Sequence, residues 1–163
     1  MRVCFHHYCS VSSMSSVNVR DMPFEAFPLK TYDKIRYADT DRQGHVNNAV
    51  FSSFLETGRV EMLYNPALSV RADNASFVIA SLKLDFKKEI LWPGTVEIGT
   101  GLLHIGTSSI RIVQKLFQQN HCTAEAETVI VHVHAETGKS LPLSDTAKEV
   151  LRTWLLASPE AGV

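Results

Sequence analysis

The chain has 163 residues, of which 45% are hydrophobic and 20% are charged, and its formal net charge is −1. This length suits one domain with a real core, and the balanced charge argues against a nucleic-acid-binding protein, which carries a basic surplus. The three cysteines cannot build a disulfide framework, and no apolar run is long enough to cross a bilayer. We therefore expect a globular, cytoplasmic protein without membrane or nucleic-acid partners.

The first residues differ in composition from the rest of the chain. They are rich in serine, lack an acidic residue before Asp21 and show no hydrophobic periodicity. We expect residues 1–24 to be a disordered tail or an extension, residues 25–157 to form a single domain, and residues 158–163 to be a second tail. The serine-rich, acid-poor composition also resembles an organelle transit peptide, so organellar import is the minority alternative.

Strands are predicted in two parts of the domain. Alternation over residues 29–37 places Ile35 and Tyr37 on one face of a first strand. Further along, alternation indicates a strand whose single buried face consists of Val78, Ala80, Leu82, Leu84 and Phe86. Three more strands are predicted at residues 95–104, 108–117 and 121–134, and the short turns between all four predict an antiparallel meander. Gly99 and Gly101 predict a bulge or a strong bend.

A long helix is predicted between the first strand and this meander. It covers residues 48–64 and takes Asn47 or Asn48 as its N-cap, because an Asn side chain accepts a hydrogen bond from a first-turn N–H. Its buried stripe consists of Phe51, Phe54, Leu55, Gly58 and Met62. Glu56 and Arg59 have the i, i+3 spacing of an ion pair on the helix surface.

A short last helix begins at about Asp145, with Ser144 as its N-cap. One strand, a long helix and four strands form an α+β layout. The economical arrangement packs the long helix against the concave face of the sheet, where Gly58 permits close approach of the two backbones.

Residues 39–48, Asp-Thr-Asp-Arg-Gln-Gly-His-Val-Asn-Asn, gather carboxylates, an imidazole and two amides directly ahead of the apolar helix. Free N–H groups at a helix start favour negative charge, so an acid or base beside them is a candidate catalytic centre. The alternative interpretation is structural: Asp39 and Asp41 form turns, Asn47 caps the helix, and His45 lies on the surface.

This decapeptide, with the helix after it, resembles the signature of hotdog-fold acyl thioesterases. It is similar both to the 4-hydroxybenzoyl-CoA thioesterase group and to plant-type acyl-ACP thioesterases, whose motif also contains His-Val-Asn-Asn. The resemblance extends over residues 32–151 in the order of the elements. It implies a hotdog fold, in which a five-stranded antiparallel sheet wraps around one long central helix. It also implies a homodimer that joins two sheets edge to edge, or a dimer of such dimers.

The resemblance further implies hydrolysis of an acyl-CoA or acyl-ACP thioester to a free acid and a thiol, without a cofactor or a metal. Asp41 matches the catalytic aspartate of the 4-hydroxybenzoyl-CoA group and would act as nucleophile or general base. His45 matches the histidine of the acyl-ACP group. Gln43 stands where that second group has asparagine and would orient water.

Two further sets of residues complete the expected site. The oxyanion hole is expected among the first-turn amides of Asn48, Ala49, Val50 and Phe51. By resemblance, the coenzyme A phosphates would contact Lys87, Lys88, Thr107 and Ser108. Two alternatives share this pocket, namely a non-catalytic acyl-thioester binding module and a hotdog enoyl-thioester hydratase.

Other chemical signals are weaker. Gly138-Lys139-Ser140 resembles the end of a P-loop, but Val133 occupies the required earlier glycine position, so we interpret the stretch as a turn. His132 and His134 share one face of a predicted strand, but no third ligand is marked, so we interpret them as a solvated or hydrogen-bonded pair.

Overall fold

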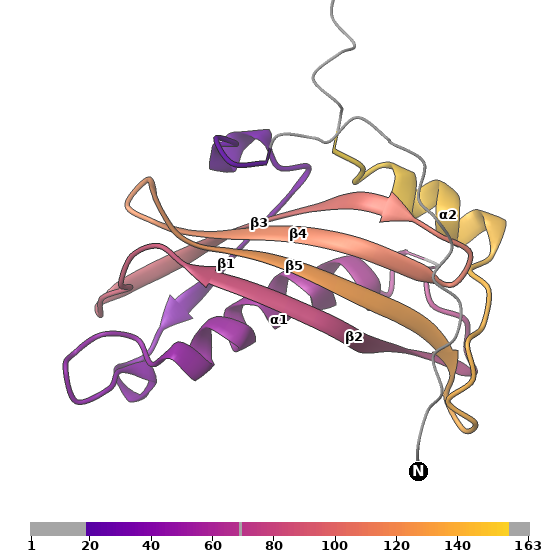
Figure 1. The fold of residues 1–163 in the computed structure, drawn as a ribbon, viewed down its shortest axis with the longest axis horizontal. Helices are drawn as coiled ribbons and strands as arrows, with labels where there is room; N and C mark the ends of the chain where they lie inside the picture. The colour runs from indigo at the N-terminus through magenta and orange to yellow at the C-terminus, as the bar shows by residue number, and fades with distance from the viewer. Residues whose placement is uncertain (1–18, 69, 157–163) are drawn as a thin grey trace, which may run out of the picture.

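The computed structural model describes residues 19–68 and 70–156, which form one sheet with a long helix on one face (Figure 1). Residues 1–18 of the first predicted tail, which covers residues 1–24, and all of the second, residues 158–163, lie outside this part of the chain. The elements are η1 (Phe24–Ala26), β1 (Leu29–Ile35), η2 (Tyr37–Asp39), α1 (Asn48–Leu63), β2 (Ala75–Phe86), β3 (Gly94–Ile105), β4 (Ser109–Gln118), β5 (His121–His134) and α2 (Asp145–Arg152). The predicted α+β architecture is confirmed.

The five strands are antiparallel and lie in the order β1-β3-β4-β5-β2. β3, β4 and β5 form the predicted meander, but β2 pairs with β5 and not with β3, so the predicted four-strand meander is wrong. Three strand spacings separate β2 from β3, about 14 Å. The link at residues 87–93 can extend over about 23 Å, so its shortness does not force its two strands to pair.

The predicted single buried face of β2 is also wrong, because the strand contains a bulge. The register against β5 shifts between Ile79 and Ser81, which leaves Ala80 without a partner. The bulge shifts the alternation of side chains by one residue. Ile79 before it and Leu82 after it therefore lie on the same face, opposite Ile130 and Thr128, and α1 covers this face of the sheet. β2 is an edge strand, and Ile79 remains 51% exposed.

The first strand ends earlier than predicted. β1 stops at Ile35, and Tyr37 belongs to the 3₁₀ turn η2, where it is 74% exposed. The chain turns here because Asp39 accepts hydrogen bonds from the backbone N–H of Arg36 at 2.7 Å and from its side chain at 3.2 Å. The Arg36 N–H therefore binds the Asp39 side chain instead of a neighbouring strand.

Helix α1 begins as predicted. Asn47 is the N-cap, and its Oδ1 accepts a hydrogen bond from the N–H of Ala49 at 3.0 Å. The predicted stripe is buried in full. A Cβ on Gly58 would lie 2.6 Å from Thr100 Oγ1 and 2.7 Å from Gln114 Nε2, so glycine allows the helix to lie directly on the sheet.

Arg59, the next residue of α1, differs from expectation. Its side chain turns inward to Gln114 on β4, and no ion pair joins it to Glu56 among the described residues. The predicted surface pair is therefore wrong.

The opposite face of the sheet carries the ends of the domain (Figure 1). Phe27 and Leu156 pack there against Gly99 and Gly101, where any Cβ would lie within 2.6 Å of the Phe27 ring or of Leu156. The irregularity in β3 falls at Leu103, so of the predicted bulge or strong bend at the two glycines, the bulge is wrong. The glycines make room for side chains instead. The described part of the chain already packs on this face from residue 19, before the expected domain start at residue 25.

Helix α2 has the predicted N-cap Ser144.

Candidate active site

The loop between β1 and α1 is built on a buried carboxylate. Asp39 forms an ion pair of 2.9 Å with Arg36, and its backbone C=O accepts a hydrogen bond from the N–H of Asn47 at 2.8 Å. Burial raises the pKa of Asp39, but the hydrogen bonds and charge of Arg36 more than compensate, so the net pKa lies below its ordinary value. Asp39 thus fixes both ends of the loop.

Asp41 lies at the exposed side of this loop. Its Oδ1 accepts hydrogen bonds from the N–H groups of Gln43 at 2.7 Å and His45 at 3.3 Å. Its own N–H donates to the C=O of His45 at 2.7 Å. Within the described chain Oδ2 has no partner, so one oxygen orients the carboxylate and the other remains free for chemistry. The Gln43 side chain is exposed beside it.

The end of the loop is attached to the segment that precedes β3. His45 forms a β-bridge with Leu91, and the N–H of Val46 donates to the C=O of Ile90 at 2.8 Å. Gln118 at the end of β4 holds Leu91 in turn, since its amide accepts from the Leu91 N–H at 3.0 Å and donates to the Leu91 C=O at 2.7 Å. His45 is therefore positioned by the sheet itself and is half-buried.

The four predicted oxyanion donors are not equivalent. The N–H of Ala49 donates to the cap, and the N–H of Val50 donates to the C=O of Asn47 at 2.9 Å. Phe51 is buried beneath the helix. The N–H of Asn48, at an exposed position, has no acceptor in the described residues, so it is a first-turn donor open to a ligand.

The two lysines predicted to contact the coenzyme A phosphates are not equivalent either. Lys87 forms an ion pair of 3.3 Å with Glu125, which also binds the buried Lys115 at 3.0 Å. Burial raises the pKa of Glu125, but the two lysines outweigh this effect and hold it below its ordinary value. Lys88 is exposed and makes no such contact with the described chain. Of the two, Lys88 is the cation free to meet a phosphate.

Thr107 and Ser108 lie far from Asp41 in the same chain. They follow β3, whose other end adjoins the loop between β1 and α1, and its twelve residues span about 36 Å. Ser108 Oγ accepts a hydrogen bond from Ser140 Oγ at 2.6 Å. A single chain therefore does not bring this turn to its own Asp41.

Two aromatic side chains beside the loop carried no signal in the sequence. The rings of Tyr37 and Trp92 meet edge to face at 5.4 Å, and both remain largely exposed. They come from segments 55 positions apart, which the pairing of Ile35 with Gly94 and the bridge between His45 and Leu91 bring together. The pair offers an aromatic surface next to Asp41.

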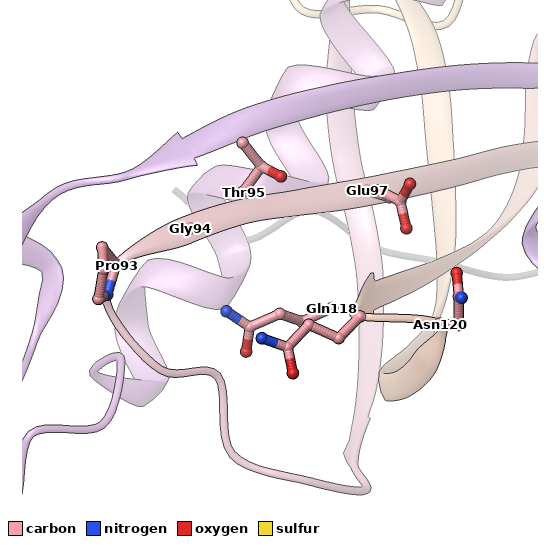
Figure 2. A pocket seen from close by; sticks show the side chains of 7 residues that line it. Pro93, Gly94, Thr95, Glu97, Gln118 and Asn120 are labelled. Atoms are coloured by element: carbon pink, nitrogen blue, oxygen red, sulfur yellow. The ribbon is translucent and has the colours of Figure 1, made fainter.

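A polar hollow of about 290 Å³ lies where β3 begins and the β4–β5 turn projects. Figure 2 shows Glu97, Gln118 and Asn120 around it. Neither Asp41 nor His45 lines this hollow, so it is separate from the candidate site in the loop between β1 and α1.

Residues 19–68 and 70–156 carry no sign of a metal site or of a membrane span. That part of the chain has no cluster of three or more His, Cys, Asp or Glu able to hold a metal, and no helix there is long and apolar enough to span a membrane. His132 is buried, with Nδ1 at 2.9 Å from the C=O of Leu141.

Known proteins share this architecture. Residues 35–155 match the profile of the thioesterase-like superfamily. Acyl-CoA thioester hydrolase YbgC of Escherichia coli is 27% identical over 111 residues, covering 66% of this chain and 80% of that protein. Long-chain acyl-CoA thioesterase FadM of Escherichia coli is 26% identical over 127 residues, covering 76% and 96%. A thioesterase of Thermus thermophilus, solved with coenzyme A and Zn, has a TM-score of 0.68 at 29% identity, covering 80% and 96%.

The profile match covers well over half of the chain, so the chain belongs to the thioesterase-like superfamily. Its sheet and central helix are the hotdog fold of thioesterases, and its class is thioester hydrolase. The predicted family is confirmed.

Proposed function

We propose that the protein is an acyl-CoA thioesterase that uses Asp41 for catalysis. One observation carries this proposal: one Asp41 oxygen is held by two loop amides while the other is unpartnered among the described residues, next to a helix start whose Asn48 N–H is open. A positioned carboxylate beside an open amide donor suits attack on a carbonyl whose oxygen becomes negative.

Two routes use the same carboxylate. As a nucleophile, Asp41 attacks the thioester carbonyl, the C–S bond breaks, the thiolate takes up a proton, and water then hydrolyses the mixed anhydride. As a general base, Asp41 takes a proton from water, which attacks the carbonyl directly. The C–S bond then breaks, and the thiolate takes up the proton from Asp41. On either route the Asn48 N–H stabilises the oxyanion, a contribution of about 3–4 kcal/mol for one such donor. His45 polarises the carbonyl or holds the loop, and Gln43 orients water.

Coenzyme A is the proposed carrier because the relatives named for acyl-CoA hydrolysis match most of this chain. Lys88 supplies a free cation for a phosphate, and the Tyr37–Trp92 pair supplies an aromatic surface for the adenine. An acyl carrier protein is the alternative source of the thioester, and an acyl-thioester panel on both carriers distinguishes them.

We also propose a homodimer that pairs two β2 strands. β2 ends the sheet, and its apolar side chains Val78, Ile79, Leu82 and Phe86 are between 38% and 51% exposed. An exposed, apolar edge strand is a template for pairing with a second chain. A two-fold pairing would also bring the partner's Thr107–Ser108 turn toward the catalytic end. Light scattering should give twice the chain mass, and the mass of a single chain would contradict this assembly.

The test of catalysis is thiol release from a panel of acyl-CoA thioesters by the wild type, Asp41→Asn and Asp73→Asn. Asn keeps an oxygen for the loop amides but removes the charge, so kcat should fall by about 10²–10⁴-fold without loss of folding. Asp73 is exposed in another loop and should leave kcat unchanged. Near wild-type turnover by Asp41→Asn would refute the assignment. Tight binding of acyl-CoA without cleavage by the wild type would favour the binding module.

A further inference from the structure

The interior between α1 and the sheet contains a cation that the described chain does not neutralise. Arg59 is 6% exposed, and its neighbour Gly58 brings the helix into contact with β3 and β4. Burial lowers the pKa of Arg59, and the charge of Glu56 on the same helix raises it in part. Arginine is seldom buried without a carboxylate partner.

The hydrogen bonds of Arg59 leave most of its donors unused. Its Nη1 donates to Gln114 Oε1 at 3.2 Å, which is its one acceptor among the described residues. Gln114 Nε2 donates to the Leu55 C=O at 2.9 Å and to Thr100 Oγ1 at 3.1 Å, so its orientation is fixed with Oε1 toward Arg59. A guanidinium has five donors in a planar fork, so further oxygen atoms can bind here.

A second unpartnered polar group lies nearby on β5. Thr128 Oγ1 is fully buried and has no hydrogen-bond partner within the described part of the chain. Gln114 pairs with Ala126, and Thr128 is two residues further on the same face, about 7–8 Å away on the diagonal. Thr128 also lies directly opposite Leu82 of β2. The cation and the hydroxyl therefore face the same interior region.

The surface between this region and the catalytic loop is apolar. On the β2 side, Leu84 and Phe86 lie between Leu82, which is opposite Thr128, and the catalytic end of α1. There Phe86 meets Phe51 edge to face at 5.0 Å. Arg59 is eleven residues beyond Asn48 on the helix, a rise of about 16 Å. A thioester held at Asn48 could thus extend an aliphatic chain along α1 toward the guanidinium.

We propose that this enzyme selects acyl groups with a carboxylate at the end remote from the thioester, and that Arg59 binds this carboxylate. The parallel N–H groups of a guanidinium match the two oxygens of a carboxylate, and the Thr128 hydroxyl adds a donor beside them. The methylene groups of such a substrate pack against the apolar side chains of β2. This inference rests on the proposed thioesterase activity.

The experiment compares matched CoA thioesters of equal length that end either in a carboxylate or in a methyl group, with lengths extending to about 16 Å. Thiol release gives kcat/KM for the full-length wild type, Arg59→Met, Arg59→Lys and Thr128→Val. Arg152→Met is the control, because Arg152 is an exposed arginine on α2.

The wild type should prefer the carboxylate-ended thioester by at least about tenfold at one length, since a site with buried donors rejects an analogue that leaves them unpaired. Arg59→Met should lose this preference through a fall in kcat/KM for the carboxylate-ended thioester. Arg59→Lys should retain part of the preference, and Arg152→Met should retain all of it. Thr128→Val should weaken this preference, because it removes the second donor.

A wild-type preference for the methyl-ended thioester, or an equal preference in wild type and Arg59→Met, would overturn the inference and leave the thioesterase proposal intact. The wild-type comparison decides even where a variant fails to fold. Absence of turnover with every thioester would overturn both proposals.

Discussion

The contact between α1 and the sheet can be tested at Gly58. A Cβ at this position would lie 2.6 Å from Thr100 Oγ1, 2.7 Å from Gln114 Nε2 and 2.9 Å from Ile98 Cγ2. All three side chains are fully buried, and Gln114 is fixed by its own hydrogen bonds, so none can move aside freely. Overpacking of this kind costs about 1–3 kcal/mol, and the cost here should reach the upper end.

Alanine also has a higher helix propensity than glycine, by about 1 kcal/mol, which offsets part of this cost. The net expectation for Gly58→Ala is a loss of about 2 kcal/mol in the free energy of unfolding. In a chain of this size that corresponds to a fall in Tm of about 4–8 °C.

Thermal unfolding followed by circular dichroism measures this change, at a fixed protein concentration because the Tm of the proposed dimer would depend on concentration. Val60→Ala is the matched control, since Val60 is half-exposed on the same helix and should change Tm little. A Gly58→Ala protein as stable as the wild type would mean that α1 does not lie on Thr100 and Gln114 as described.

Two further predictions concern the loop and the outer face. The pKa of Asp39 is lower in the folded than in the unfolded state, where it is about 3.9, so its stabilising effect is complete above that pH and is lost as pH falls through the folded pKa. The urea concentration at the midpoint of unfolding should therefore decrease less between pH 7 and pH 2 in Asp39→Asn than in the wild type. An equal decrease in both proteins would contradict the ion pair with Arg36. Gly99→Ala would place a Cβ 2.5 Å from the Phe27 ring and should release the segment at residues 19–27. Limited trypsin digestion should then cut at Arg20 faster than in the wild type, and unchanged protection would refute the packing.

Local features of the fold could be predicted from the sequence because they depend on neighbouring residues. The cap at Asn47, the buried stripe of α1 and the cap at Ser144 each follow from a spacing of three or four positions. The turn at residues 119–120 is similarly local, because both residues adopt positive φ angles. Such features need no knowledge of what lies across the sheet.

Pairing across the sheet could not be predicted in this way. The alternation in β2 was real, but the bulge at Ala80 reversed its phase, and a bulge is fixed by the partner strand more than by its own sequence. The glycines of β3 show the same limit. Gly99 makes room for Phe27, a residue 72 positions earlier, and no local rule connects the two.

The candidate site contains some features that could be predicted from the sequence and others that could not. Asp41 and His45 belong to one short loop, so their proximity follows from the sequence, and the structure adds which oxygen and which amide are free. The different surroundings of Lys87 and Lys88 depend on Glu125, and the aromatic pair at Trp92 depends on how the segment before β3 crosses the loop. The sequence identified the candidate catalytic residues better than the surface that would hold the rest of the substrate.

Arg59 explains why charge alone was misleading. In α1 it follows Leu55 by four positions and precedes Met62 by three, so helix periodicity places it within the buried stripe. Its charge suggested a surface pair with Glu56, and that interpretation ignored the periodicity. A charged residue at a core position of an otherwise apolar helix should therefore be treated as buried, and its missing partner should be sought among ligands. For this reason, the substrate preference of the Arg59 variants tells more about specificity than the Asp41→Asn experiment, which tests catalysis.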